Sequence, residues 1–204
     1  LELVVGTSGE QPPLTAKNKG GKIIGLDADL ARYLANAMEV ELRFEVMPFP
    51  ELLPALEGGK VDMVLSGMTM TPKRNLKVAF VGPYYISGKG ILTKIETVAS
   101  LKEASGMNRP DFTVAALKNS TSQLFAEKLI PRANLVTPNS LDDAVELVIQ
   151  GKVDALVADY PVCAVSAFRH RGKGLAAGEV RFTVEPLGIA LPANDPLLVN
   201  VPVP

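Results

Sequence analysis

The stretch Ser66-Gly67-Met68-Thr69-Met70-Thr71-Pro72-Lys73-Arg74 joins an apolar run to a hydroxyl-rich turn and ends in a guanidinium. The preceding run, Val61–Leu65, predicts a buried strand, and open α/β sheets hold their ligands at the carboxyl ends of such strands. Thr71 before Pro72 is typical of a helix N-cap with proline at the first helical position. The turn therefore combines hydroxyls, backbone N–H groups and Arg74, which suit a carboxylate or another small anion. The alternative is an ordinary strand, turn and helix with solvated polar residues.

The composition excludes several classes of protein. The 204 residues, 47% apolar and 21% charged, are ordinary for a globular chain of one large domain or two small ones. A net charge of −1 and 5% aromatic residues argue against nucleic acid as a partner. No apolar run is long enough for a membrane span. The start, Leu1-Glu2-Leu3-Val4-Val5, lacks the features of a signal peptide, so we expect any targeting segment to have been removed or never present.

The single cysteine and the single histidine argue against most metal and nucleophilic sites. Cys163 has no partner for a disulfide or a cysteine-based metal cluster, and its apolar neighbours predict a small buried residue. His170 lies in the basic run Arg169-His170-Arg171, which is typical of a solvated loop. We therefore expect no metal, no cofactor and no catalytic triad.

Strands alternate with helices along the chain, which predicts an α/β fold with parallel sheets. Asp27 or Asp29 is expected to cap a helix that runs to Met38, and an alternating strand follows at 40–46. Further strands are expected at 1–6, 61–65, 77–81, 90–94, 112–117, 135–136 and 153–158, a turn at 82–88, and helices at 51–57, 100–104, 122–129 and 140–150.

A short repeat divides the chain into two similar halves. Ala55-Leu56-Glu57-Gly58-Gly59-Lys60-Val61-Asp62 resembles Leu147-Val148-Ile149-Gln150-Gly151-Lys152-Val153-Asp154. Each copy contains a helix end, a Gly-Lys-Val-Asp link and the start of an apolar strand. Two lobes would explain both copies, and we expect the first lobe to comprise 1–88 plus 186–204 and the second 89–185.

If these lobes share a cleft, Ser66, Thr69 and Arg74 would present a fork for a carboxylate on one wall. Asp159 would face them with an acceptor for an ammonium group. Such a pair matches a free α-amino acid, which would bridge the lobes and favour their closure. The alternative for Asp159 is a cap on the turn at Tyr160-Pro161.

Two further groups have both a binding and a structural interpretation. Phe49 could lie along the aliphatic part of a ligand, although a lone aromatic is more often part of the core. Ser120, Thr121 and Ser122 offer hydroxyls and N–H groups at a helix N-terminus, where ordinary N-capping is the slightly favoured interpretation.

Taken together, these residues resemble the periplasmic solute-binding proteins of amino-acid ABC transporters, bacterial extracellular solute-binding family 3. The resemblance covers essentially the whole chain. It implies the type II periplasmic-binding-protein fold, with two α/β lobes, each a mostly parallel sheet flanked by helices, joined by two crossing strands. It is carried by Gly25-Leu26-Asp27-Ala28-Asp29-Leu30, Leu53-Pro54-Ala55-Leu56, Gly59-Lys60-Val61-Asp62, the opening stretch, Tyr84-Tyr85-Ile86-Ser87-Gly88 and Asp159.

The resemblance also implies a role for each candidate residue. Arg74 would hold the α-carboxylate with help from Thr69, and Asp159 would take the α-ammonium. The other residues implied in ligand binding are Ser66 and Gly67 through their backbone, Thr121 with its neighbours Ser120 and Ser122, and Phe49, which would pack on the ligand side chain.

Two departures from the family pattern concern specificity and the end of the chain. Many members carry Asp at the position of Ser8 and an aromatic residue at that of Gln11, where the ligand side chain is recognised and covered. Ser8 weakens the case for a lysine- or arginine-specific site unless Glu10 substitutes, and Gln11 removes a stacking lid. The family usually continues with a further helix and a Lys-Trp tail, whereas this sequence ends at Pro204.

The implied function is capture of a free, polar amino acid outside the cytoplasm, in the periplasm, and its delivery to a membrane ABC permease by a monomer that is not an enzyme. One alternative is the ligand-sensing extracellular domain of a membrane receptor, with signalling domains as partners. A second is an enzyme like cyclohexadienyl dehydratase, in which Arg74 holds a carboxylate and Glu10 or Asp159 moves a proton. The sequence shows no paired acid and base, which favours binding.

Overall fold

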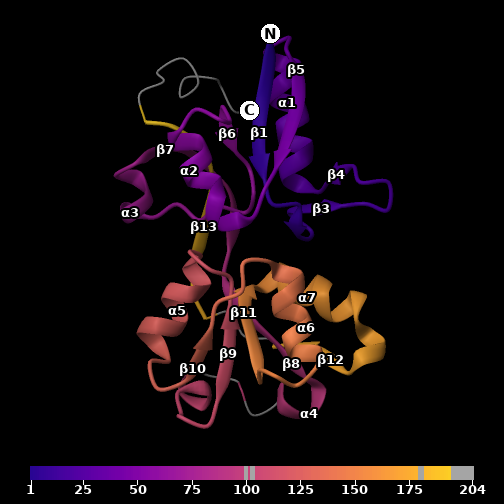
Figure 1. Cartoon of the computed structure of the whole chain (residues 1–204), viewed down its shortest axis with the longest axis vertical. Helices are drawn as coiled ribbons and strands as arrows, with labels where there is room; N and C mark the ends of the chain where they lie inside the picture. Colours follow the sequence, from indigo (N-terminus) through magenta and orange to yellow (C-terminus); the bar gives the residue numbers. More distant parts are fainter. Residues whose placement is uncertain (99–100, 102–103, 179–181, 194–204) are drawn as a thin grey trace. The chain divides into compact units, whose positions relative to one another are not determined.

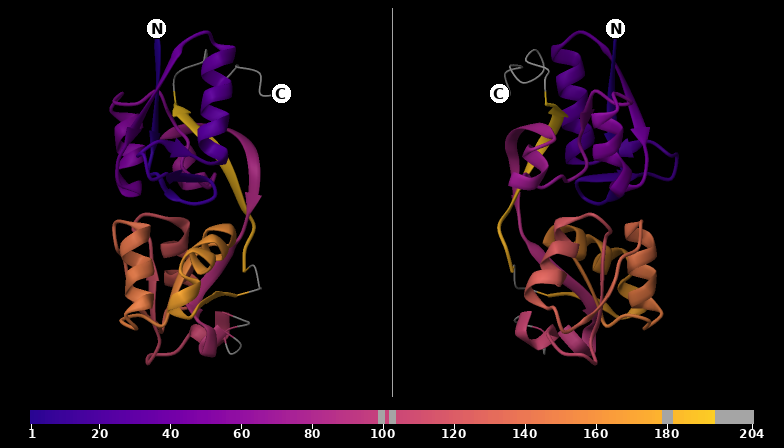
Figure 2. Two further views of the ribbon diagram at one scale, coloured as in Figure 1. Left: turned by 90° about the vertical axis from the view of Figure 1, so that its right-hand side faces the viewer. Right: turned by 60° about the vertical axis from the view of Figure 1, so that its left-hand side comes forward.

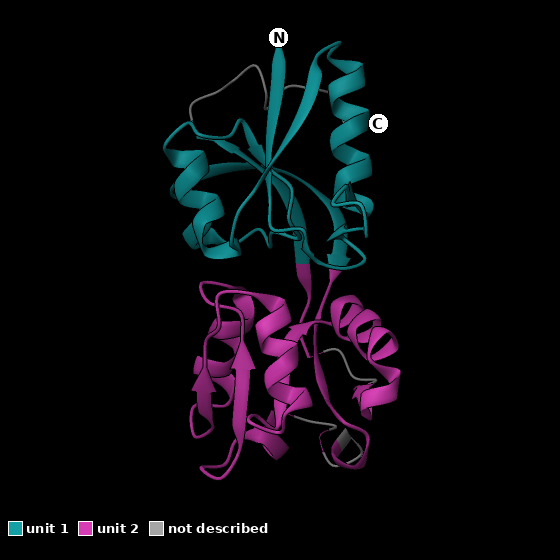
Figure 3. Ribbon diagram, turned by 45° about the vertical axis from the view of Figure 1, so that its right-hand side comes forward, with its two compact units in different colours: residues 1–86, 186–204 teal, residues 87–185 magenta. Residues whose placement is uncertain are grey.

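The computed structural model describes residues 1–98, 101, 104–178 and 182–193 (Figure 1). Contacts within the chain divide it into two compact units (Figure 3). Unit 1 is Leu1–Ile86 with the residues from Pro186 onward, and unit 2 is Ser87–Glu185. The chain passes between the units twice, within the strands β7 (Val78–Ser87) and β13 (Glu185–Pro192).

Unit 1 is built on a five-stranded sheet of order β5-β1-β6-β13-β7. β1 is parallel to both of its neighbours, and β13 is antiparallel to β6. The part of the chain between β1 and α1 forms a small three-stranded sheet, β2-β3-β4. The remaining elements are β1 (Glu2–Thr7), β2 (Glu10–Gln11), β3 (Thr15–Lys17), β4 (Ile23–Ile24), α1 (Leu26–Ala37), β5 (Glu41–Val46), η1 (Phe49–Glu51), α2 (Leu52–Glu57), β6 (Met63–Val64) and α3 (Pro72–Asn75).

Helices cover both faces of the unit 1 sheet (Figure 2). On one face, Ala31 and Leu34 of α1 pack with Leu3 and Val5 of β1 in a buried apolar cluster. On the other face, α2 packs on β1 and β6. A sheet covered on both sides has no need of polar alternation, which explains the apolar run that begins the chain.

Unit 2 contains a second five-stranded sheet, of order β10-β9-β11-β8-β12. β9 is parallel to β10 and β11, whereas β8 is antiparallel to β11 and β12. Its elements are β8 (Lys89–Lys94), α4 (Ile95–Val98), η2 (Ala104–Met107), β9 (Thr113–Ala116), α5 (Thr121–Leu129), β10 (Asn134–Val136), α6 (Leu141–Ile149), β11 (Ala155–Asp159), α7 (Tyr160–Arg169), η3 (Arg171–Lys173) and β12 (Leu175–Ala177).

Successive residues of β11 enter two different cores. Leu156 joins a cluster with residues of α6 and α7, and Val157 joins one that contains Phe125 of α5. This division follows from the two-residue period of a strand. Figure 1 shows α5 on one side of this sheet and α6 and α7 on the other.

The sequence repeat is also a repeat of hydrogen bonds. Asp62 N–H donates to Val4 O over 2.8 Å, and Val4 N–H returns a bond to Asp62 Oδ2 over 2.7 Å. Asp154 and Thr113 make the same pair over 2.8 and 2.7 Å. In each unit the aspartate therefore ties the entrance of one strand to the parallel strand beside it, β1 in unit 1 and β9 in unit 2, so the shared aspartate is structural.

Several sequence expectations needed correction. The helix α1 begins at Leu26 and its N-cap is Gly25, without a side-chain cap, so neither Asp27 nor Asp29 has that role. The turn expected at 82–88 is instead part of the continuous strand β7. The helix expected at 100–104 lies largely outside the described residues, and α4 precedes it. Among the residues that the structure describes, no helix is both long and apolar enough to span a bilayer.

The N-terminus of α1 approaches its neighbouring loop so closely that only glycine fits. Gly25 has a φ of +115°, and a Cβ there would lie 2.4 Å from Leu14 O and 2.6 Å from Pro13 O. The same two carbonyls accept hydrogen bonds from Leu26 and Asp27 N–H. This contact fixes the loop that carries Gln11 against the helix.

We predict that Gly25→Ala destabilises the protein more than Gly59→Ala. Gly59 also has a positive φ, +70°, but nothing lies within 4 Å of a Cβ there. Strain alone should lower the free energy of unfolding by about 1–2 kcal/mol in Gly59→Ala, and overpacking against backbone should add roughly 1–3 kcal/mol in Gly25→Ala. Urea denaturation measures both, and equal losses would contradict the close approach.

Candidate functional site

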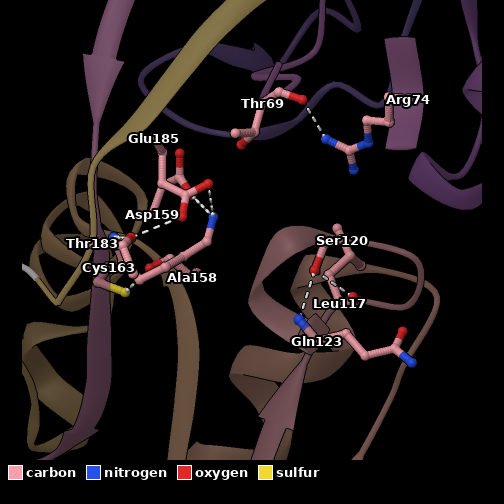
Figure 4. A network of polar contacts seen from close by, with 11 residues as sticks. Thr69, Arg74, Leu117, Ser120, Gln123, Ala158, Asp159, Cys163, Thr183 and Glu185 are labelled. Atoms are coloured by element: carbon pink, nitrogen blue, oxygen red, sulfur yellow. Dashed lines mark hydrogen bonds and ion pairs between the residues drawn. The ribbon is translucent and has the colours of Figure 1, made fainter. Parts of the chain in front are cut away.

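In unit 1, Arg74 is held beside Thr69 and Phe49. Thr71 Oγ1 caps α3 by accepting the Arg74 N–H over 3.2 Å, as the sequence predicts. The Arg74 side chain turns back, and its Nη1 donates to Thr69 O over 2.7 Å (Figure 4). Its guanidinium lies 5.8 Å from the centre of the Phe49 ring. Thr69 and Phe49 are buried, so the guanidinium is contacted from two sides by buried residues.

Ser66 and Ser8 connect the ends of two neighbouring strands. Ser66 Oγ accepts the Ser8 N–H and lies 3.0 Å from Ser8 Oγ. Both side chains are buried. The Ser66 hydroxyl is therefore engaged inside unit 1, and it supports the turn that follows β6.

Gly67 is enclosed by side chains and its N–H is engaged. The N–H donates to Asp27 Oδ2 over 2.7 Å. With a φ of +57°, a Cβ at Gly67 would lie 2.9 Å from Leu14 Cδ1 and 3.0 Å from Gln11 Oε1. Gln11 is thus brought against the turn. The Gly67 N–H is thus engaged within unit 1, and its close approach to Gln11 is a structural contact.

Asp27 is bonded to this turn, whereas sequence reasoning gave it a role only as a helix cap. Its side chain is 1% exposed, and Tyr84 OH donates to its Oδ1 over 2.8 Å. Burial raises its pKa to about 6, and the bonds from Tyr84 and Gly67 oppose that shift. The spacing of Asp27, Ala31 and Leu34 places this carboxylate on the buried face of α1, and that pattern could have revealed it.

In unit 2, Asp159 lies at the end of β11 with its carboxylate 7% exposed. It does not cap α7 through its side chain, so the capping alternative is wrong. Lys89 Nζ donates to Asp159 Oδ1, and the same Nζ lies 3.6 Å from Glu185 Oε2 (Figure 4). Asp159 Oδ2 is buried and has no hydrogen-bond partner among the described residues. A buried acceptor of this kind requires an explanation, because leaving it unpaired costs free energy.

Ser120, Thr121 and Ser122 form the start of α5. Ser120 is its N-cap, and its Oγ accepts the Gln123 N–H over 3.2 Å and donates to Leu117 O. Thr121 is half-buried and Ser122 is buried. The capping interpretation of Ser120 is therefore correct, and the geometry adds no ligand role for this hydroxyl.

Sequence reasoning also missed Ser87 and Lys89. In the described part of the chain, Ser87 Oγ and Asp159 Oδ2 are the buried side-chain oxygens without a hydrogen-bond partner. Lys89 is paired in register with Asp159, and Ser87 precedes it by two residues. An exposed-looking lysine carries no sequence signal for burial. The described residues contain no group of three or more His, Cys, Asp or Glu placed to hold a metal ion.

Comparison with known proteins decides the family. Residues 3–103 match the model of the bacterial extracellular solute-binding proteins, family 3. The crystal structure of the ancestral amino acid-binding protein AncCDT-1, a precursor of cyclohexadienyl dehydratase, is 37% identical with a TM-score of 0.90, covering 98% of this chain and 85% of that one. The chain belongs to the bacterial extracellular solute-binding proteins, family 3.

Two further relatives agree with this membership. A putative binding component of an ABC transporter from Wolinella succinogenes, complexed with lysine, is 34% identical, with a TM-score of 0.89 over 98% of this chain and 85% of that one. The ABC transporter arginine-binding protein 1 of Escherichia coli is 29% identical over 77% of this chain. The chain spans 63% of the length of the Escherichia coli protein.

Membership in this family confirms three expectations from the sequence. The family is the one that the motifs resemble, its members are extracellular by description, and the structural likeness confirms the type II periplasmic-binding-protein fold. The relatives named above are described as binding proteins.

We predict a pH-dependent stability difference between the wild type and Asp27→Asn. Because the folded pKa of Asp27, about 6, exceeds its ordinary value of 3.8, the folded state holds an extra proton between these values. Wild-type stability should therefore fall as pH rises from 3 to 7, relative to the variant, by about 3 kcal/mol at 1.36 kcal/mol per pKa unit. Chemical denaturation at several pH values measures this difference.

Asp29→Asn is the matched control, because Asp29 lies in the same helical turn with an exposed side chain paired to Arg32. A parallel pH profile for Asp27→Asn and Asp29→Asn would contradict the assigned burial of Asp27.

Proposed function

We propose that this chain captures a free α-amino acid outside the cytoplasm and delivers it, as a monomer and without catalysis, to a membrane ABC permease. The observation that carries the proposal is Asp159 Oδ2, a buried carboxylate oxygen without a partner in the described chain. A ligand ammonium would satisfy it. The names of the relatives, an arginine-binding protein and a lysine-bound component of ABC transporters, support the same ligand class.

The carboxylate end of the ligand is assigned to Arg74 in unit 1. A guanidinium recognises a carboxylate through two parallel N–H···O bonds. Thr69 and Phe49 contact this guanidinium from two sides, which reduces the entropy lost when a ligand binds. One amino acid that used both half-sites would favour the conformation in which both are engaged.

The ligand side chain is assigned to the loop that carries Ser8 and Gln11. Ser8 is engaged with Ser66, and Gln11 lies against Gly67. Neither supplies a carboxylate for a basic side chain, so Glu10 is the acid that this loop offers. The proposal accordingly rests on the α-carboxylate and α-ammonium that all amino acids share.

A thermal-shift screen of the twenty amino acids tests the proposal directly. An amino acid present at about 100 times its dissociation constant should raise the free energy of unfolding by about 2.7 kcal/mol. Their 2-oxo-acid analogues, which lack the ammonium, should give no shift. A screen in which no amino acid raises the melting temperature would contradict the proposal.

We predict that Arg74→Gln weakens binding of the amino acid found by that screen. Loss of the guanidinium should cost on the order of 2–5 kcal/mol of binding free energy, a fall in affinity of roughly 30-fold or more. Isothermal titration calorimetry measures the change. Arg43→Gln is the matched control, because Arg43 of β5 makes exposed ion pairs with Glu2 of β1 and Glu45 of β5, and this variant should bind normally.

The name of AncCDT-1 connects the fold with an enzyme, so catalysis needs its own test. The candidate acid Asp159 is held in an ion pair with Lys89 through its Oδ1, an arrangement that supports binding over proton transfer. We expect no aromatic product when the protein is incubated with prephenate or arogenate. Product formation with multiple turnovers would overturn the binding-only proposal.

A further inference from the structure

The buried group around Lys89 contains more charge than the recognition of one ammonium requires. Lys89 is 2% exposed, Asp159 is 7% exposed and Glu185 is 8% exposed. Lys89 Nζ donates to Asp159 Oδ1 and lies 3.6 Å from Glu185 Oε2. Buried ions are costly unless they are paired and hydrogen-bonded. This arrangement therefore has a purpose beyond simple packing.

We propose that Lys89 is a positioning residue that pairs with both Asp159 and Glu185 and holds Asp159 Oδ2 available for the ammonium of a ligand. The inference rests on the proposed function, since the ligand ammonium is the group proposed to bind Asp159 Oδ2.

Geometry supports this role for Lys89. It is directly opposite Asp159 in the antiparallel pairing of β8 and β11. Its backbone N–H donates to Thr183 Oγ1 over 3.0 Å, and Thr183 Oγ1 donates to Glu185 Oε1 over 2.8 Å. Glu185 Oε2 therefore faces Lys89 Nζ, and Glu185 Oε1 accepts from Thr183 Oγ1. Asp159 Oδ1 accepts from Lys89 Nζ. The remaining oxygen, Asp159 Oδ2, is the one left without a described partner.

The charges of Lys89, Asp159 and Glu185 also support the positioning role of Lys89. Two carboxylates and one ammonium leave one negative charge, and a ligand ammonium would neutralise it. Among the described residues, Cys163 of α7 is a further ionisable group beside Asp159, and its pKa is raised to about 12 by burial and by the Asp159 charge. That thiol is neutral at physiological pH. Among the described contacts of Asp159, Lys89 is therefore the protein cation that pairs with both acids.

Removal of Lys89 should change how this group responds to pH. Two buried carboxylates without a cation repel one another, and one of them retains a proton. A ligand ammonium must then displace that proton, so affinity should fall as pH falls. In the wild type the Lys89 ammonium supplies the positive charge that the retained proton supplies in the variant. The affinity of the wild type should therefore not fall in this way as pH falls.

The first test needs no ligand and uses Lys89→Met. Because the folded variant retains a proton that its unfolded chain releases, its stability should fall as pH rises. We expect its folding equilibrium constant, relative to wild type, to fall about tenfold or more between pH 5 and pH 8. Lys94→Met is the matched control, since Lys94 lies on the same strand and its Nζ donates only to backbone carbonyls in the described contacts. Parallel profiles for Lys89→Met and Lys94→Met would overturn the inference.

The second test measures binding of the amino acid that gives the largest thermal shift, by calorimetry at pH 6 and pH 8. The affinity of Lys89→Met should rise about tenfold more than that of wild type over this range, and Lys89→Arg should restore the wild-type profile. The comparison is made relative to wild type because Asp27 titrates near pH 6 in every variant. A wild-type profile in Lys89→Met would overturn the inference.

Two variants keep the tests decisive. If Lys89→Met does not fold, Glu185→Gln is the alternative, because it retains Lys89 and removes the excess negative charge. Its affinity for the amino acid should fall about tenfold, and unchanged affinity would overturn the inference.

Asp159→Asn separates the two proposals. If it binds every amino acid as wild type does, the ammonium site of the proposed function fails. If it binds weakly while Lys89→Met has the wild-type pH profile, only the role of Lys89 fails.

Discussion

The bonds between an aspartate and the neighbouring parallel strand help to determine where the candidate residues at the ends of β6 and β11 lie. Asp62 exchanges two hydrogen bonds with Val4, and Asp154 makes the same exchange with Thr113. Each aspartate stands just before a buried strand, and a shift by one residue would send alternate side chains to the opposite face. The register set here delivers Ser66 and Gly67 to the end of β6 and Asp159 to the end of β11. In each unit the candidate residues at the strand end therefore depend on one pair of backbone and carboxylate bonds.

Local signals in the sequence predicted much of this arrangement. Thr71 and Pro72 mark the start of α3 by composition alone, and the Gly-Lys-Val-Asp repeat marks the matching links in the two units. These features depend on a few neighbouring residues, so a linear reading is sufficient. The family resemblance then suggested roles for Arg74 and Asp159 that composition could not supply, and those roles remain proposals.

The missed residues form contacts between distant parts of the chain. Asp27 joins Gly67 and Tyr84, and Lys89 joins Asp159 and Glu185, across separations that the sequence does not reveal. The strand through Gly82 was missed for a different reason. Gly82-Pro83 is typical of a turn, but at this point β7 continues as an edge strand of its sheet, where proline is tolerated.

The single cysteine of the chain provides an internal chemical reporter. Cys163 is 1% exposed and its thiol is neutral at physiological pH, so it cannot react with an alkylating reagent from the folded state. Its Sγ also donates a weak hydrogen bond to the backbone O of Ala158, the residue that precedes Asp159. Reaction of this thiol therefore requires local opening of unit 2 beside Asp159. The rate of alkylation would measure how often this part of the molecule opens, separately from unit 1, which contains no cysteine.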